Sequence, residues 1–191
     1  MTKVAITGGI GSGKSIVCKI LETLGYPVYY SDKRAKILID TSPSIKKTLK
    51  ELYGQDIYLK EHINKKKLAD IIFKSKKELT KVNSIVHPEV ENDFKKWTAE
   101  QKGNIVFKES AIIFESHLEN LFDYIICISA DTETRIQRVI KRESCTRDSI
   151  TERIDNQLSQ RTVSERSDYT INNSNNKALL PQIINIINNI K

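Results

Sequence analysis

The chain has 191 residues, of which 39% are hydrophobic, and its formal net charge is +7. That length suits a single domain with one substantial core. No run approaches the roughly 18 apolar residues that a membrane helix needs, and the N-terminus shows no signal-peptide pattern. We therefore expect a cytoplasmic protein without a membrane partner. Its three cysteines are widely spaced and form no Cys-x-x-Cys pair, which argues against a disulfide framework and a zinc site.

The excess positive charge belongs to the middle of the chain. Residues 33 to 102 hold 17 Lys and Arg against 10 Asp and Glu, whereas the remainder holds 14 of each. A basic surface can bind nucleic acid, but no aromatic residues are interleaved with the basic ones and no nucleic-acid motif is present. Lysine-rich, solvated helix faces are the commoner explanation, and an anionic small substrate is another. We expect no nucleic-acid partner.

The strongest motif lies near the N-terminus. Residues 8 to 15 read Gly-Gly-Ile-Gly-Ser-Gly-Lys-Ser and fit the pattern that builds a nucleotide-phosphate loop. The apolar run before the motif predicts a strand over residues 3 to 7, and the pattern after it predicts an amphipathic helix over residues 15 to 24. The motif therefore has the strand and the helix that such a loop requires.

Each residue type in the loop has a chemical task. The glycines let the backbone bring several N–H groups onto one anion, and the following helix presents its positive N-terminal end to the same phosphates. Lys14 would reach the β- and γ-phosphates, and the Ser15 hydroxyl would bind Mg²⁺. The predicted nucleotide site comprises Gly8, Gly9, Ile10, Gly11, Ser12, Gly13, Lys14, Ser15 and Ile16.

The rest of the chain is typical of an α/β fold with a parallel sheet. Further strands are predicted over residues 26 to 30, 104 to 107, 124 to 128 and 168 to 171, and a closing helix over residues 179 to 190. Residues 43 to 102 show helical periodicity in pieces and lack strong strand signals, which indicates a helical insertion. Within it, His87-Pro88 is expected to end one helix and begin another.

Two carboxylates follow predicted strands. Asp32 comes directly after the second strand, where open parallel sheets place their ligands, although Ser31 or Asp32 would equally well cap the next helix. Glu109 ends the third strand and is a candidate for holding Mg²⁺, often through water; the alternative is a solvent-facing strand end. His87 beside a proline is more often structural than catalytic.

Seven of the eight arginines lie between residues 135 and 166. They form much of two helical stripes, Arg135, Arg138 and Arg142 after the fourth strand, then Arg153, Gln157 and Arg161. The polar segment of residues 143 to 148 between these stripes could fold over a bound nucleotide. Arginine is always charged and fork-shaped, so it suits phosphoryl oxygens in a transition state. The alternative is a surface laced with Arg–Glu pairs, because Glu133, Glu143 and Glu152 are near.

On these residues the chain resembles the dephospho-coenzyme A kinase family over essentially its whole length. Residues 7 to 15 are similar to that family's version of the loop, and Asp32 falls on the second aspartate of its Asp-x-Asp element. Other positions fall in the expected order: His87-Pro88, Ala111 to Glu115, Arg138, Arg142, Thr146-Arg147, Gln157 and Asp168 to Asn173. The resemblance implies transfer of the γ-phosphoryl group of ATP to the 3′-hydroxyl of dephospho-coenzyme A, the last step of coenzyme A synthesis.

The resemblance also implies roles for particular residues. Asp32 would orient the ribose 3′-hydroxyl and accept its proton. Lys14, Arg142 and Arg138 would stabilise charge on the transferred group, and Arg142 and Asn173 would also contact the nucleotide. Ser15 and Glu109 would hold Mg²⁺.

The implied architecture is a three-layer P-loop NTPase fold with a parallel sheet. Its parts would be a core of residues 1 to 30, 103 to 142 and 161 to 191, a helical coenzyme A-binding insertion of residues 31 to 102, and a lid of residues 143 to 160. The implied protein is a monomer or a weak homo-oligomer.

The chain departs from the family pattern at five positions. Tyr30 replaces the first aspartate of Asp-x-Asp, Lys36 an arginine, Ile16 a threonine, Ala111 a proline and Asn175 a glycine. Ile16 removes one hydroxyl that could contact the α-phosphate. None of these changes removes a residue that the chemistry requires.

Two other functions share part of the pattern. A nucleoside monophosphate kinase would have the same loop, arginines and lid, but a phosphate acceptor calls for arginines in the middle segment, where Arg34 stands alone. A GTPase-like switch would need a base-specificity motif such as Asn-Lys-x-Asp, which the chain lacks.

Overall fold

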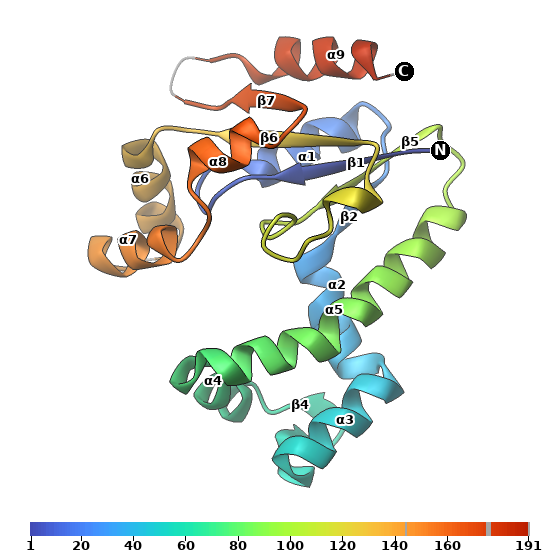
Figure 1. The fold of residues 1–191 in the computed structure, drawn as a ribbon, viewed down its shortest axis with the longest axis vertical. Helices are drawn as coiled ribbons and strands as arrows, with labels where there is room; N and C mark the ends of the chain where they lie inside the picture. The colour runs from blue at the N-terminus through green and yellow to red at the C-terminus, as the bar shows by residue number, and fades with distance from the viewer. Residues whose placement is uncertain (144, 175–176, 191) are drawn as a thin grey trace. The chain divides into compact units, whose positions relative to one another are not determined.

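The computed structural model of the protein describes residues 1–143, 145–174 and 177–190. Asn175, one of the departures from the family pattern, lies outside these residues. The chain divides into two compact units, one made of Met1–Tyr29 and Lys102–Lys191 and the other of Tyr30–Gln101. Each unit is described in turn (Figure 1).

The larger unit is built on a five-stranded sheet. Its strands are β1 (Thr2–Thr7), β2 (Val28–Tyr30), β5 (Ile105–Glu109), β6 (Tyr124–Ser129) and β7 (Tyr169–Asn172), in the order β2-β5-β1-β6-β7. β1 pairs in parallel with β5 and β6, and β6 pairs in parallel with β7. The predicted α/β class with a parallel sheet is therefore confirmed.

Helices cover both faces of this sheet. The helices of this unit are α1 (Lys14–Thr23), α6 (Thr132–Glu143), α7 (Arg147–Asp155), α8 (Gln160–Glu165) and α9 (Leu179–Asn189), with the short turn η2 (Glu119–Leu121). Ile6 faces α1 and α9, where Leu21 and Ile183 line the same small apolar space. Its neighbour Ala5 packs on the other face with Val163 of α8.

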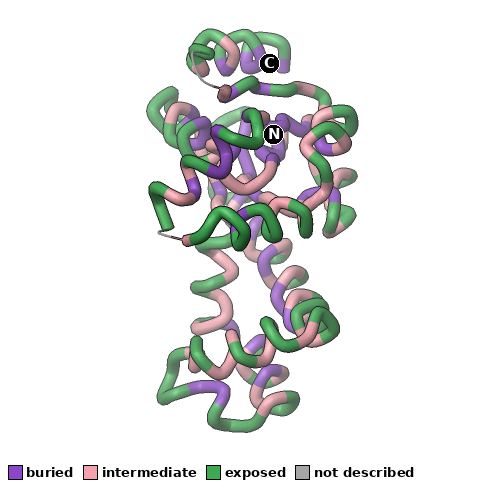
Figure 2. Tube along the Cα trace, turned by 90° about the vertical axis from the view of Figure 1, so that its left-hand side faces the viewer, coloured by how far each residue is buried: buried purple, intermediate pink, exposed green. Residues whose placement is uncertain are grey.

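Alternation along buried strands explains these layers. Because successive side chains of a strand point to opposite faces, a strand covered on both faces must be apolar throughout. Residues 4 to 6 of β1 and 125 to 128 of β6 are all buried. In Figure 2 buried stretches, drawn in purple, gather around the N-terminal end of the trace.

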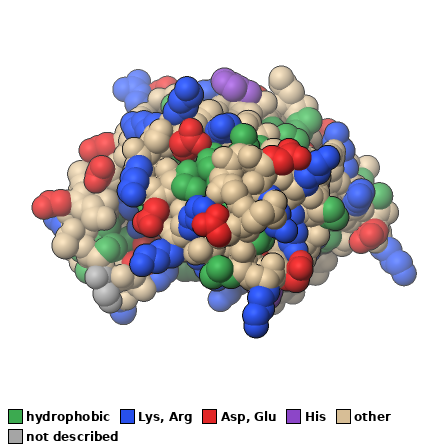
Figure 3. Space-filling model, turned by 90° about the horizontal axis from the view of Figure 1, so that it is seen from below, with side chains coloured by type: hydrophobic (Ala, Val, Ile, Leu, Met, Phe, Trp, Pro, Cys, Tyr) green, Lys and Arg blue, Asp and Glu red, His purple; other side chains and the backbone are tan. Residues whose placement is uncertain are grey.

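The smaller unit is mostly helical. Its elements are α2 (Ser31–Thr41), α3 (Pro43–Tyr53), η1 (Gln55–Ile57), β3 (Tyr58–Leu59), β4 (His62–Ile63), α4 (Lys65–Lys74) and α5 (Lys76–Ala99). The antiparallel pair of β3 and β4 was not predicted, because two-residue strands leave no periodic pattern. On the face drawn in Figure 3, basic and acidic side chains are interspersed.

The expected helix break at His87-Pro88 is wrong. α5 runs through Pro88 without interruption. Proline removes one backbone hydrogen bond and crowds the preceding turn, which usually kinks or ends a helix. Here a buried stripe of Val82, Val86, Val90 and Phe94 continues on both sides of the proline. The packing of one continuous face therefore outweighs the local cost.

In the ranges described, no helix has both the length and the apolar character needed to cross a membrane.

Candidate functional site

The predicted phosphate loop connects the end of β1 to the start of α1. Gly8, Gly11 and Gly13 have φ values of +137°, +76° and +97°, a backbone region that residues other than glycine rarely adopt. Gly13 is also the residue that caps α1, and a methyl group there would overlap the carboxamide of Asn173. The glycines therefore meet a backbone and a packing requirement that other residues would not.

Lys14 and Ser15 begin the helix after the loop. The Lys14 ammonium donates to the Gly8 carbonyl at 2.8 Å and to the Gly9 carbonyl at 3.4 Å. Ser15 and Ile16 lie exposed in the first turn of α1. The ammonium thus lies against the loop, and two exposed helix residues follow it.

Two further predicted site residues meet the loop at Ser12. The Asn173 side-chain amide, just after β7, donates to the Ser12 carbonyl at 2.7 Å, and the residue is 6% exposed. Arg138 of α6 donates to the Ser12 carbonyl at 3.5 Å and to the Asn173 carbonyl at 2.9 Å. The structure therefore brings Arg138, Asn173 and the loop together, with both side chains bonded to backbone.

Two residues that the sequence did not tie to the loop hold its tip at Ile10. The Arg135 Nε donates to the Ile10 carbonyl at 2.8 Å, and the Ile10 N–H donates to the Gln157 Oε1 at 2.9 Å. Ile10 also packs against a cluster formed by α6 and α7, which includes Val139 and Ile150. For Arg135 the only signal was its helical spacing, which names no partner. The second predicted helical stripe, Arg153, Gln157 and Arg161, is wrong, because α7 ends at Asp155 and α8 begins at Gln160, so that Gln157 lies between the two helices.

Arg142 has a different environment. It lies exposed near the end of α6 and pairs with Glu143, which also accepts from Arg153 at 2.6 Å. Arg153 and Arg142 together hold the pKa of the Glu143 carboxyl below its usual value. This is the Arg–Glu pairing named above as the alternative to a phosphate contact.

A second such pair links the first turn of α6 to the start of α7. Arg147 donates to both oxygens of Glu133, at 3.0 and 2.6 Å. Hydrogen bonds from Arg147, and then from Gln137, lower the pKa of the Glu133 carboxyl to about 2. Ion pairs thus connect glutamates of α6 to arginines of α7.

Glu109 lies at the carboxyl edge of the sheet, as the phosphate loop does. It is the last residue of β5 and is in register with Ile6 of β1, two residues before Gly8. In the described ranges, no group of three or more His, Cys, Asp or Glu residues is placed to hold a metal. A hydroxyl and one carboxylate are hard oxygen donors that suit Mg²⁺ when phosphates and water complete its shell. The residues present therefore fit a cation that binds together with a nucleotide.

Asp32 belongs to the smaller unit. It is the second residue of α2 and lies exposed. Neither Ser31 nor Asp32 caps this helix, because the cap position is Tyr30 and no side chain bonds there. The capping alternative is therefore wrong, and the Asp32 carboxylate does not serve as a helix cap.

Two other residues named from the sequence also belong to this unit or its border. His87 lies inside α5. The Lys33 ammonium lies 3.9 Å from the centre of the Tyr30 ring.

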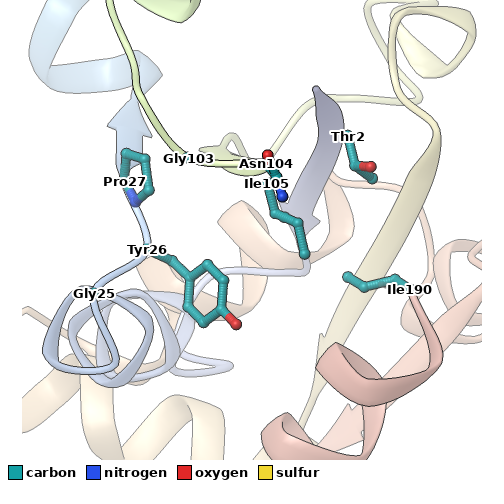
Figure 4. Close-up of a pocket in the computed structure, with 8 residues that line it drawn as sticks. All are labelled: Thr2, Gly25, Tyr26, Pro27, Gly103, Asn104, Ile105 and Ile190. Carbon is teal, nitrogen blue, oxygen red and sulfur yellow. The ribbon is translucent and has the colours of Figure 1, made fainter.

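One cavity of the larger unit lies away from the phosphate loop. It has a volume of about 430 Å³ and opens at the amino ends of the strands, as Figure 4 shows. Its lining residues are Thr2, Gly25, Tyr26, Pro27, Gly103, Asn104, Ile105 and Ile190. Because the phosphate loop follows the carboxyl end of β1, this cavity is not part of the predicted site.

Comparisons with known proteins agree with the loop and with the fold. A shikimate kinase from Acinetobacter baumannii, in complex with shikimate, matches with a TM-score of 0.55 at 14% identity, over 100% of this chain and 93% of that one, which is a likeness of fold alone. TT1252 from Thermus thermophilus matches with a TM-score of 0.84 at 25% identity, over 99% of this chain and 95% of that one. A dephospho-CoA kinase from Bacteroides fragilis is 38% identical over 186 residues, which are 97% of this chain and 91% of the relative. Residues 2–178 match the model of the dephospho-CoA kinase family, and the chain belongs to that family.

Proposed function

We propose that the chain transfers the γ-phosphoryl group of ATP to the ribose 3′-hydroxyl of dephospho-CoA, giving CoA and ADP. The observation that carries this proposal is a phosphate loop in a chain of this family, with positive-φ glycines and the Lys14 ammonium against its carbonyls. Curated relatives such as the Bacteroides fragilis protein are dephospho-CoA kinases.

ATP binding follows from the loop. Its backbone N–H groups and the N-terminal end of α1 favour an anion. Lys14 now donates to two neutral carbonyls. Phosphate oxygens carry negative charge and the carbonyls do not, so Coulomb attraction would draw the ammonium from the carbonyls to the phosphates.

A magnesium ion would be held by the Ser15 hydroxyl and, through water, by Glu109. When bound with the nucleotide, it would neutralise charge on the phosphate oxygens. MgATP is accordingly the form of the co-substrate that we propose.

Asp32 is the proposed base. The 3′-oxygen forms a bond to the γ-phosphorus, the bond from that phosphorus to the bridging oxygen breaks with its electron pair leaving on ADP, and the hydroxyl proton passes to the Asp32 carboxylate. Asp32 is exposed and caps no helix, so its carboxylate is available for this task. The basic residues of the 31–102 insertion would attract the pyrophosphate of the acceptor.

The arginines would act on the transferred group. Arg138 already bonds to the loop backbone, whereas Arg142 would exchange Glu143 for phosphoryl oxygens. The lid of residues 143 to 160 would close over the nucleotide and exclude water. We propose a cytoplasmic protein that works as a monomer or a weak homo-oligomer.

A nucleoside monophosphate kinase is not favoured. A phosphate acceptor would need arginines in the insertion, and Arg34, the sole arginine there, forms a two-bond ion pair with Asp93 at 2.8 and 2.6 Å.

The test is ADP release with ATP and Mg²⁺ against dephospho-CoA, AMP, CMP, adenosine and pantothenate. We expect turnover with dephospho-CoA alone. Asp32→Asn should lower kcat by about 10²- to 10⁴-fold at unchanged ATP affinity, because it removes the proton acceptor. Asp70→Asn removes an exposed carboxylate of the same unit and serves as the matched control. Turnover with a monophosphate, or an active Asp32→Asn variant, would contradict the proposal.

A further inference from the structure

Arg135 is a buried cation at the phosphate loop. Its relative exposure is 4%, and its Nε donates to the Ile10 carbonyl at 2.8 Å. The start of its helix is fixed, since the Asp131 carboxylate accepts from the Thr134 N–H at 2.8 Å and from the Thr134 hydroxyl at 2.7 Å. The guanidinium is therefore held in one place relative to the loop.

The loop is shaped around this side chain. A methyl group on Gly9 would overlap the Arg135 guanidinium, and one on Gly11 would overlap the Arg135 carbonyl. Two of the loop glycines thus meet Arg135, one through its side chain and one through its backbone. A loop with side chains at these positions could not approach α6 so closely.

Ile10 is the residue through which Arg135 would act. Its carbonyl is bonded to Arg135, its N–H to Gln157, and its side chain packs against α6 and α7. A phosphate loop works when its N–H groups face the anion, which requires its carbonyls to turn away. The bond from Arg135 holds one of those carbonyls on the α6 side.

The positive charge of Arg135 is buried. Burial lowers its pKa, yet arginine stays protonated in proteins. Within the residues described, Arg135 forms no ion pair with a carboxylate, and its partner is the neutral Ile10 carbonyl. A buried positive charge that no carboxylate neutralises favours an anion in the adjoining loop.

We infer that Arg135 is a positioning residue for ATP: it holds the Ile10 carbonyl and so sets the phosphate loop for the triphosphate. This inference rests on the proposed function, and it concerns the ATP side of the reaction alone. The acceptor side should not depend on Arg135.

The experiment compares Arg135→Met and Arg135→Lys with Lys141→Met, which removes an exposed positive charge from the same helix. The readouts are KM for each substrate and the dissociation constants for MgATP and for dephospho-CoA. Urea unfolding first establishes that each variant is folded under the assay conditions. Removing a charged donor from the partly buried Ile10 carbonyl should weaken MgATP binding on the order of 10- to 100-fold in Arg135→Met. Dephospho-CoA binding should stay within about two-fold of the wild type, the spread expected for an independent site.

Rescue distinguishes positioning from packing. Arg135→Lys keeps the charge and one donor, so it should recover part of the MgATP affinity, and Lys141→Met should match the wild type. MgATP affinity unchanged in folded Arg135→Met, or lost equally with dephospho-CoA affinity, would overturn the inference. If Arg135→Met does not fold, Arg135→Lys and Arg135→Gln decide, because MgATP binding as tight as in the wild type in both would also overturn it. A wild type that binds no MgATP would instead overturn the proposed function.

Discussion

Arginines on α6 and in the segment after it fall into two groups. The loop arginines, Arg135 and Arg138, donate to backbone carbonyls of the phosphate loop. The exposed arginines, Arg142 of α6 and Arg147 and Arg153 of α7, pair with glutamates. Arg135, Arg138 and Arg142 share one helix and one stripe, so position along α6 decides which kind of partner each residue finds.

The difference separates residues that shape the site from residues free to enter it. A shielded carbonyl that loses its donor costs about 1–3 kcal/mol, so the loop arginines contribute to the fold as well as to the site. An exposed ion pair contributes about 0–1 kcal/mol, so an exposed arginine can exchange its glutamate for a phosphate at little cost. The loop arginines are thus held in position in advance, whereas the exposed arginines are available to bind a phosphate.

Arg138→Met should show the largest effect, because we expect it to lower both the stability of the fold and the rate of the reaction. Loss of the donor to Ser12 and Asn173 should lower the free energy of unfolding by about 1–3 kcal/mol. Loss of a cation from the proposed transition state should lower kcat by about 10²- to 10³-fold. Urea unfolding and steady-state kinetics measure the two, with Lys141→Met as the control. A variant of unchanged stability would place Arg138 outside the first group.

Arg142→Met should separate the two effects. We expect a loss of kcat of about 10²-fold, since this arginine is proposed to reach the transferred group. Its side chain is 60% exposed, so the free energy of unfolding should change by no more than about 0.5 kcal/mol. The same two measurements apply. Full activity in this variant would leave Arg142 as a surface ion pair and nothing more.

Much of the fold could be predicted because its signals are local. The phosphate loop is a contiguous motif, and buried parallel strands read as apolar runs such as Tyr124–Ser129. The failures concern tertiary packing. Pro88 predicts a break, but a buried stripe on both sides keeps α5 continuous, and the two-residue strands β3 and β4 are too short to leave a pattern.

The site was harder to predict for a related reason. Helical spacing places Arg135, Arg138 and Arg142 on one face, but it does not say that α6 approaches the loop at its first turns and emerges into solvent at its last. Gln157 reaches Ile10 across 147 positions of sequence, and no local pattern encodes that contact. Candidate site residues could be named from the sequence, whereas the partners that they contact depend on the assembled fold.

Glu143→Gln should have a smaller effect, and in the opposite direction to the arginine variants. Glu143 pairs with both Arg142 and Arg153, so neutralising it frees these two arginines for the nucleotide. We expect KM for ATP to fall by about two- to five-fold, the range that an exposed ion pair of up to about 1 kcal/mol allows. The gain should shrink at high ionic strength, where such pairs are already screened. An unchanged KM at low salt would show that Glu143 does not compete with phosphate.

Glu133→Gln should have the smallest effect, one visible through pH. Hydrogen bonds from Arg147 and then Gln137 lower the Glu133 pKa from 4.5 to about 2 in the folded chain. A depressed carboxyl pKa means that the folded state favours the ionised form, so its stabilisation is complete above pH 4.5 and is lost as the pH falls toward 2. The wild type should therefore be slightly more stable than Glu133→Gln at neutral pH, and urea unfolding should show that difference shrinking across that acid range. The loop arginines bond to carbonyls, which do not titrate there, so Arg138→Met should keep its deficit at every pH where the chain folds. A deficit of Glu133→Gln that persists at pH 2 would mean that the residue acts through packing rather than through its charge. The exposed ion pairs would then resemble the loop contacts more closely than their exposure implies.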